Sequence, residues 1–354
     1  MQMHMMAGTG CRSAASFSVA MLPLAVAAAV GGLAAAAPPF PSATTWSRAA
    51  WLNGSVGMIR TELPPDAVQA FVFASTIGFH ELRFNGAVLG GGVDKLFEPG
   101  VGVYGLRSRV TSFNVTSLLE TGNCFGALLG NGPSAICGNG QASACSDGAG
   151  TTAGAQCAAQ GPDWPGPGGM ADSRNGGCKA GAANGRAFRA VIALTFANRS
   201  TREIVTAADG SWQTAASPML FDDMYLGERF DGRAAERTKG FWRAGYTGPT
   251  QKAVPTVLVK AGAANVYGGG VNRSAIMSEA VGPPMRVTKT YPAISVQAVP
   301  GSPGLWTYDF GTTLTGVGEL ALTGVPKTKP QTAAGAVMVT LSFAVMLVEG
   351  RAAQ

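Results

Sequence analysis

The sequence predicts an all-β protein made of two antiparallel, jelly-roll-like β-sandwich domains with a long Gly/Ala/Cys-rich insertion. Three observations lead to this fold class. The chain of 354 residues contains 50 Gly and 21 Pro, which favour turns over long helices. No segment beyond the N-terminus carries a sustained apolar stripe at helical spacing. Many short alternating segments separated by turn residues are typical of antiparallel sandwiches.

Residues 1–37 are predicted to be a secretion signal peptide. Arg12 supplies a weakly positive start, residues 17–33 form an apolar run, and residues 35–37 (AAA) fit a small-residue cleavage site. A membrane anchor is the alternative, but the run is short for a span and is interrupted by Gly and Pro. We therefore expect a secreted, extracellular protein that does not stay at a membrane after cleavage.

Four Asn-x-Ser/Thr sequons agree with a secretory route, and none has Pro at the middle position. N-glycosylation of such motifs requires a surface position. The candidate glycosylation sites are Asn53, Asn114, Asn198 and Asn272.

Five cysteines remain after signal removal. No CxxC pair occurs and no His is near in sequence, which argues against a zinc site. In an oxidising compartment, disulfides that staple loops are the expected role, and the odd count leaves one thiol unpaired or paired with another chain. The disulfide candidates are Cys124, Cys137, Cys145, Cys157 and Cys178.

The first domain is predicted over residues 46–250, and a tight hairpin is its clearest element. In "GFHELRFNGAVLG" (residues 78–90), apolar and polar side chains alternate along an extended strand. Asn85-Gly86 then supplies two residues that tolerate positive φ, the strongest short-range hairpin signal. Further strands are expected at residues 68–75, 110–119, 124–129, 188–197 and 203–207, with Asp209-Gly210 as a second turn.

Residues 131–186 depart from this pattern. Gly, Ala, Ser and Cys dominate there, and a structureless stretch of such length is uncommon inside a compact domain. We therefore predict an inserted surface loop. A second sandwich is predicted over residues 255–351, with strand-like segments at 255–261, 285–299, 305–311, 318–325 and 336–350.

Several motifs occur in the order known from one enzyme family. They are "GFHELRFNG" (78–86), "LFEPG" (96–100) followed by Tyr104 and Arg107, "FNVT" (113–116) with Leu118-Leu119, "NCFGALLGNG" (123–132), "DGSW" (209–212), "YLGERFDGR" (225–233), "PPMR" (283–286), "DFG" (309–311) and "VTLSFAVML" (339–347). This order resembles that of bacterial-type alpha-L-rhamnosidases. The chain departs from the family pattern where no Trp follows Gly132, at Thr312-Thr313, and at Val345.

The resemblance implies two accessory β-sandwich modules, an N-terminal one and a concanavalin-like one. In the family, inverting hydrolysis is carried out by carboxylates of a following helical barrel, and this chain stops at Gln354, where that barrel would begin. We therefore expect a non-catalytic accessory or carbohydrate-binding region, inactive alone, whose ligand is a rhamnose-containing glycan. The alternatives are a truncated gene model of a full alpha-L-rhamnosidase that hydrolyses terminal rhamnosides, and a structural or adhesion protein of the cell surface.

No catalytic, cofactor-binding or metal site is predicted, and no cofactor is expected. Inverting glycoside hydrolysis needs two suitably separated carboxyl groups, but we expect the acidic cluster of Asp222, Asp223, Glu228 and Asp231 to pair with Arg229 or Arg233. His80 is expected to be a satisfied strand histidine. The net charge of +6 is spread out, which argues against nucleic acid as a partner. The aromatic residues available for stacking on sugars are Trp212, Tyr225, Trp242, Tyr246 and Trp306, each of them more typical of packing.

Overall fold

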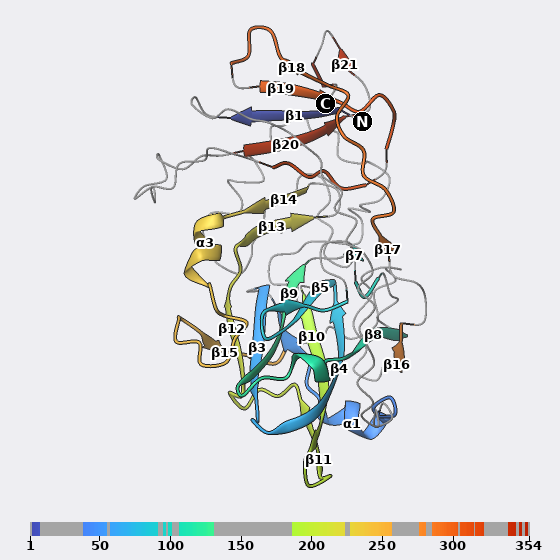
Figure 1. Cartoon of the computed structure of the whole chain (residues 1–354), viewed down its shortest axis with the longest axis vertical. Helices are drawn as coiled ribbons and strands as arrows, with labels where there is room; N and C mark the ends of the chain where they lie inside the picture. The colour runs from blue at the N-terminus through green and yellow to red at the C-terminus, as the bar shows by residue number, and fades with distance from the viewer. Residues whose placement is uncertain are drawn as a thin grey trace. The chain divides into compact units, whose positions relative to one another are not determined.

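The computed structural model describes residues 2–7, 38–54, 57–90, 95–96, 98–100, 106–130, 186–223, 227–256, 276–280, 285–303, 305–314, 316–321, 339–344, 347–348 and 351–352 (Figure 1). The chain forms two compact units, residues 33–286 and residues 1–32 together with 287–354. Strands dominate both units, and most of them pair antiparallel. The all-β prediction is therefore confirmed.

The larger unit contains two six-stranded sheets. Sheet I has the order β11 (Thr201–Val205), β10 (Ala187–Phe196), β4 (Ala67–Ile77), β8 (Arg107–Asn114) and β16 (Ile276–Glu279), with β2 (Leu52–Asn53) paired to β10. Sheet II has the order β15 (Gln251–Lys252), β12 (Trp212–Ala216), β3 (Gly57–Leu63), β9 (Asn123–Gly130), β5 (Phe79–Phe84) and β6 (Ala87–Val88). Neighbouring strands are antiparallel, except that β16 runs parallel to β8.

One hydrophobic core lies between the two sheets, as expected for a sandwich. Side chains alternate along each strand, so that Ile59, Val72 and Ile192 point into this core and are fully buried. An aromatic group sits at its centre. The ring centroids of Phe188 and Trp212 are 5.8 Å apart, and Phe125 meets Trp212 edge to face at 6.4 Å.

The predicted hairpin is present as β5 and β6. Asn85 and Gly86 have φ of 48° and 83°, so both residues of the turn are left-handed, as a two-residue hairpin with matching twist requires. His80, Leu82 and Phe84 are buried on the inner face of β5, while the residues between them are partly exposed. The alternation read from the sequence is thus confirmed residue by residue.

Short helices and small strand pairs complete the larger unit. They are α1 (Ala43–Arg48), the 3-10 helix η2 (Thr116–Leu118), α3 (Gly232–Arg237), the pair β13 (Met219–Asp223) and β14 (Gly227–Phe230), and the pair β7 (Lys95–Leu96) and β17 (Met285–Arg286). Helix α1 is not anticipated by the sequence analysis. It begins at Ser42, whose Oγ accepts the Thr45 N–H at 3.1 Å, and it packs Trp46 with Phe71 and Phe73 on the outer face of sheet I.

In the other unit, a four-stranded sheet has the order β18 (Ser295–Ala298), β19 (Leu305–Asp309), β1 (Gln2–Ala7) and β20 (Val339–Ala344), and β21 (Leu347–Val348) pairs with β22 (Arg351–Ala352). Tyr308 and Phe310 form a small buried cluster beside this sheet. Strand β1 belongs to the segment predicted to be a signal peptide, and residues 8–37 lie outside the described residues. Secretion stays a prediction.

The larger compact unit ends at Arg286, because β16 pairs with β8 and β17 pairs with β7. The domain ranges 46–250 and 255–351 stay a prediction. Within the predicted insertion, Arg186 is described, and residues 131–185 lie outside the described part of the chain.

Candidate functional site

His80 is held between the two sheets by hydroxyl groups. Its Nδ1 is 2.5 Å from Thr76 Oγ1, and its Nε2 is 3.0 Å from Thr111 Oγ1. Both threonines come from strands of sheet I, whereas His80 comes from β5 of sheet II. The side chain is 8% exposed and both ring nitrogens have partners, so the expectation of a satisfied strand histidine is confirmed.

The most extensive polar site lies on the outer face of sheet II, under residues 238–246, here called the covering segment. Phe241 of this segment is fully buried against Met58 of β3 and Ala215 of β12. Trp242 and Tyr246 pack around the same cluster, with their ring centroids 4.9 Å and 5.4 Å from that of Phe241. The chain therefore closes this sheet face with its own aromatic residues.

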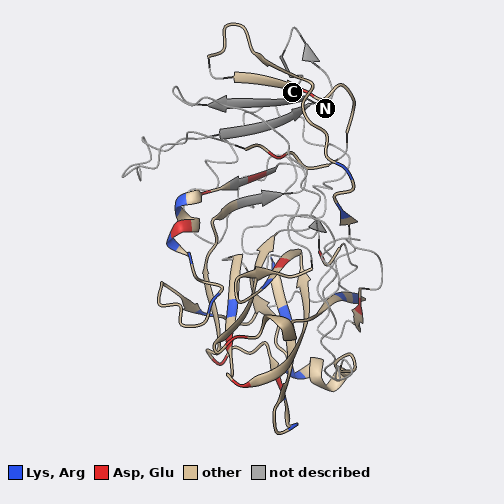
Figure 2. Cartoon of the chain, in the orientation of Figure 1, with Lys and Arg blue, Asp and Glu red and all other residues tan. Residues whose placement is uncertain are grey.

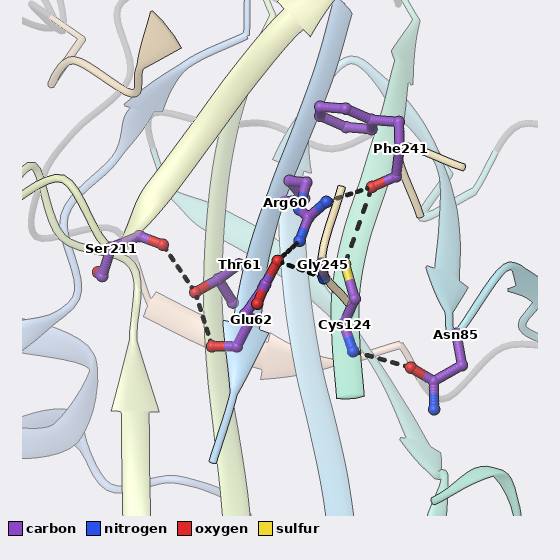
Figure 3. Close-up of polar contacts among 8 residues, drawn as sticks. All are labelled: Arg60, Thr61, Glu62, Asn85, Cys124, Ser211, Phe241 and Gly245. Atoms are coloured by element: carbon purple, nitrogen blue, oxygen red, sulfur yellow. Dashed lines mark hydrogen bonds and ion pairs between the residues drawn. The ribbon is translucent and has the colours of Figure 1, made fainter. Parts of the chain in front are cut away.

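Arg60 is the centre of this site (Figure 3). Its side chain is completely buried, and its Nη1 donates to the Phe241 carbonyl at 3.0 Å. Its Nη2 pairs with the Glu62 carboxylate, which also accepts the Gly245 N–H at 2.9 Å. Arg60 thus ties the covering segment to β3 at two points, directly at Phe241 and through Glu62 at Gly245.

Two aromatic faces complete the surroundings of the Arg60 guanidinium. Its central carbon lies 5.7 Å from the Phe241 ring centroid and 5.8 Å from that of Tyr246, within cation–π range. Thr61 points to the other side of β3 and donates to the Ser211 carbonyl at 2.9 Å (Figure 3). The strand alternation therefore places Met58, Arg60 and Glu62 on the face of β3 under the covering segment, with Thr61 on the opposite face.

Gly126 of β9 allows the covering segment to approach the sheet closely. A Cβ at this position would lie 2.9 Å from Cζ3 of Trp242 and would also collide with the Ile59 carbonyl. The other side of the indole meets Arg83, whose guanidinium carbon is 5.6 Å from the ring centroid. Trp242 is thus packed against both a glycine and an arginine of sheet II.

Cys124 lies on β9 beside Arg60, with its Sγ 4.0 Å from the Phe241 carbonyl. It is a free thiol with 1% exposure, so no disulfide forms at this candidate site in the structure. Burial raises the pKa of Cys124 to about 12. The thiolate is the reactive form of cysteine, so this thiol is expected to be inert at neutral pH. Cys137, Cys145, Cys157 and Cys178 lie outside the described residues.

We expect Cys124 to resist alkylation in the folded protein and to react on unfolding. Because its pKa is raised, its contribution to stability is complete below about pH 9 and is lost as the pH rises towards about 12. The free energy of unfolding of the wild type should therefore fall more steeply above pH 9 than that of Cys124→Ala. Chemical denaturation at several pH values measures this difference, and equal slopes would contradict it.

Peptide mapping after alkylation without reduction complements this test. If the remaining four cysteines pair with one another, as the odd count suggests, only Cys124 should be modified in denatured, unreduced protein. Modification of all five cysteines would contradict the predicted disulfides.

The acidic cluster predicted between residues 222 and 231 is only partly brought together. Asp231 caps α3, where its Oδ1 accepts from the Arg233 N–H and side chain at 2.9 Å each, so its expected pairing with Arg233 is confirmed. The hydrogen bond from Arg233 lowers the pKa of Asp231. In the hairpin of β13 and β14, Asp222 lies opposite the exposed Glu228. Directly opposed residues are about 5 Å apart at Cβ.

The aromatic candidates for sugar stacking are mostly used for packing. Trp212 is fully buried, and its Nε1 donates to the Val205 carbonyl at 3.0 Å. Trp306 packs against the cluster of Tyr308 and Phe310. Tyr225 lies outside the described residues.

Sequence reasoning missed a second buried arginine, Arg189, on the outer face of sheet I. Its Nε donates to the Ala49 carbonyl at 2.9 Å and its Nη2 donates to the Trp46 carbonyl, which satisfies two carbonyls at the end of α1. The rings of Trp46 and Trp51 flank its guanidinium, with centroids at 5.7 Å and 5.6 Å. Burial lowers the pKa of Arg189 to about 10, so it remains charged at neutral pH.

Arg60 and Arg189 each follow apolar residues within a buried strand, in "GMIRTEL" and "AFRAVIALTF", and this is the sequence signal that could have identified them. Elsewhere in the described residues, Lys and Arg are interspersed with Asp and Glu (Figure 2). Among those same residues, no group of three or more His, Cys, Asp or Glu side chains is placed to hold a metal ion. No helix there has the length and apolarity needed to cross a membrane.

Comparison with known proteins gives a family match and several structural likenesses. The alpha-L-rhamnosidase from Dictyoglumus thermophilum is 22% identical, with a TM-score of 0.48 over 72% of this chain. The Streptomyces avermitilis alpha-L-rhamnosidase, solved with L-rhamnose, is 19% identical, with a TM-score of 0.44 over 73%. The Aspergillus terreus enzyme is 20% identical, with a TM-score of 0.41 over 60%. This chain spans 22% of the length of each of these structures.

No curated protein matches the chain. Residues 66–152 match the family model described as the alpha-L-rhamnosidase N-terminal domain. The matched region begins at β4 and includes the Asn85-Gly86 hairpin, β8 and β9. Over these residues, therefore, the chain matches the alpha-L-rhamnosidase N-terminal domain family, which confirms the resemblance that the order of its motifs predicts.

Proposed function

We propose that this chain is a non-catalytic accessory region of a secreted alpha-L-rhamnosidase-like protein, and that its ligand is a rhamnose-containing glycan. The family match over residues 66–152 supports the relationship to rhamnosidases. The structure solved with L-rhamnose indicates the class of sugar that a related protein binds. The ion pairs made by the acidic residues of this chain support the absence of hydrolytic activity.

The proposal rests on the ion pairs that these acidic residues form. Five carboxylates, from different parts of the larger unit, each pair with an arginine: Glu62 with Arg60, Glu81 with Arg83, Glu120 with Arg243, Glu203 with Arg48, and Asp231 with Arg233. Inverting glycoside hydrolysis requires one carboxyl group with a raised pKa and a second that activates water. Each of these five carboxylates has an arginine as its ion-pair partner, and the hydrogen bond from Arg233 lowers the pKa of Asp231, which is opposite to the shift that a general acid needs.

The covering segment separates the buried Arg60 from a substrate. Glu62 is occupied by Arg60 and by the Gly245 N–H, and the covering segment lies over this part of sheet II. A sugar could reach Arg60 only if the segment were displaced. We therefore assign the outer face of sheet II a structural role, and we expect glycan binding to be weak and to take place elsewhere on the chain.

We expect the purified chain to show no hydrolysis of 4-nitrophenyl α-L-rhamnopyranoside above a protein-free blank. The measurement is release of 4-nitrophenol, with an active alpha-L-rhamnosidase as the positive control. The matched variant is Asp222→Asn with Glu228→Gln, which neutralises an acidic pair that lies directly opposed in the hairpin of β13 and β14. Turnover by the wild type that disappears in this variant would show that the chain is a hydrolase.

Glycan binding is a separate measurement. Rhamnose-terminated glycans on an array should retain the chain more strongly than matched mannose-terminated glycans. Equal retention would contradict a rhamnose-containing ligand and would favour a purely structural or adhesive role.

A further inference from the structure

The four sequons differ in how the fold presents them, and we infer that Asn198 is the principal N-glycosylation site of this chain, while Asn53 is unmodified in the folded protein. This inference rests on the proposed secretion, because the modification takes place in the secretory pathway. Asn272 lies outside the described residues. The other three sequons differ in the exposure of their Asn residue. Asn114 and Asn198 also differ in the group that the sequon's Thr or Ser hydroxyl contacts.

Asn198 lies at the tip of the β10–β11 hairpin and is exposed. Its Oδ1 accepts two hydrogen bonds from Ser200, from the N–H at 2.9 Å and from the hydroxyl at 2.6 Å. The sequon hydroxyl thus contacts the amide that would be modified. Within the described part of the chain, the Asn198 Nδ2 makes no hydrogen bond, so a glycan on this nitrogen replaces no contact of the fold.

The backbone of the tip holds this geometry in place. Arg199 has φ of +66°, its N–H donates to the Phe196 carbonyl at 2.8 Å, and the Phe196 N–H donates to the Ser200 carbonyl at 2.9 Å. The turn therefore closes through main-chain hydrogen bonds that do not involve the Asn198 amide. A bulky substituent at Nδ2 is compatible with all of them.

Asn114 is exposed at the end of β8, but the hydroxyl of its sequon is used by the fold. Thr116 Oγ1 accepts the Ala70 N–H at 3.1 Å and donates to the Ala70 carbonyl at 3.4 Å. Once β4 and β8 have paired, the Thr116 hydroxyl bonds to the backbone of Ala70 and not to the side-chain amide of Asn114. We therefore expect a lower occupancy at Asn114 than at Asn198.

Asn53 is less accessible than Asn198. It is partly buried on β2, where it is paired to Ala187, and its N–H donates to the Val254 carbonyl at 2.8 Å. The hydroxyl of its sequon, that of Ser55, lies outside the described residues. Because Asn53 lies within a paired strand and is only partly exposed, we expect it to be unmodified in the folded, secreted population.

The reaction is a transfer of an oligosaccharide from a polyprenyl diphosphate carrier to the amide nitrogen. The bond between the anomeric carbon and the carrier's diphosphate oxygen breaks, and a bond from that carbon to Asn198 Nδ2 forms. The amide loses one proton, and the diphosphate carries the departing electron pair. No oxidant or reductant is required.

The test is expression of the full chain in a eukaryotic secretory host, followed by peptide mapping before and after treatment with peptide-N-glycosidase. The enzyme converts each modified Asn to Asp, so occupancy is measured at each sequon. We expect Asn198 to be the most occupied, Asn114 to be less occupied, and Asn53 to be unmodified. Modification of Asn53 in folded protein, or an unmodified Asn198, would overturn the inference.

Three variants test the role of the hydroxyl. Ser200→Ala should abolish modification of Asn198, and Ser200→Thr should retain it. Ser211→Ala is the matched control, because the Ser211 hydroxyl makes the same 2.6 Å contact to Asp209 on the next turn without a sequon. This change should leave the Asn198 occupancy unaltered.

The N-terminal peptide separates failure of this inference from failure of the proposed secretion. If residues 1–37 are retained and no sequon is modified, secretion itself fails. If residues 1–37 are removed and Asn198 is unmodified, the site assignment alone is wrong.

Discussion

Replacing Trp212 with alanine is expected to lower the free energy of unfolding by about 3–5 kcal/mol, the range for removing a large aromatic residue from a core. Trp212 is fully buried, contacts the rings of Phe125 and Phe188, and donates from Nε1 to the Val205 carbonyl. The variant leaves a cavity at the centre of the sandwich and an unpaired carbonyl beside it. Equilibrium denaturation in urea, followed by far-UV circular dichroism, measures the loss.

Two companion variants make this result interpretable. Trp212→Phe keeps most of the volume but loses the hydrogen bond to Val205, so it should cost less than the alanine change and serves if the latter fails to fold. Trp306→Ala removes a partly buried tryptophan from the other unit and should not alter the stability of the sandwich by a comparable amount. A loss below about 1 kcal/mol for Trp212→Ala would contradict the core position, because buried aromatic truncations exceed this value.

Replacing Arg60 with methionine is expected to cost about 2–3 kcal/mol, because hydrogen bonds to charged groups contribute about 1.5–3 kcal/mol each and methionine retains much of the side-chain volume. The change removes the donor to the Phe241 carbonyl and the partner of Glu62. The covering segment then loses its direct attachment at Phe241, and the Glu62 carboxylate that holds Gly245 loses its ion-pair partner. Chemical denaturation measures the stability, and alkylation of Cys124 under native conditions measures release of the segment.

Arg48→Met is the matched control. Arg48 also pairs with a carboxylate, Glu203, but this pair is on the surface, with side-chain exposures of 55% and 38%. Exposed ion pairs contribute less than about 1 kcal/mol. Equal losses for the two variants, or Cys124 unreactive in Arg60→Met, would contradict the view that Arg60 fastens the covering segment.

Several strands of the larger unit could be predicted because each depends on neighbouring residues, whereas β3 and β12 were not predicted. The hairpin at Asn85-Gly86, the buried run that became β9, and the alternation in β5 are local patterns with periods that strands impose. Family resemblance added the order of these elements. The partners of each strand in the two sheets were not predictable, because they join residues far apart in the chain.

The structural role of the covering segment could not be predicted either, because it too depends on contacts between residues far apart in the chain. Arg60 and Phe241 are 181 residues apart, and nothing near Arg60 indicates that an aromatic segment will cover it. Helix α1 is too short for a periodic apolar stripe, and only its Ser42 cap marks it in the sequence. Strand β16 adds in parallel to an edge of sheet I. Such a pairing has no local turn signal, so the sequence does not indicate that residues 276–279 belong to the larger unit.

The side chain of Asn85 has a consequence for the order in which the sandwich assembles. Its Nδ2 donates to the Leu118 carbonyl and to Asn123 Oδ1, and its Oδ1 accepts the Cys124 N–H, so the hairpin tip is bonded to residues 33 to 39 positions further along the chain. A glycine at this position would permit the same turn but make none of these bonds. The hairpin that is simplest to recognise is thus completed only when β9 docks, which couples a fast local closure to a slower long-range one.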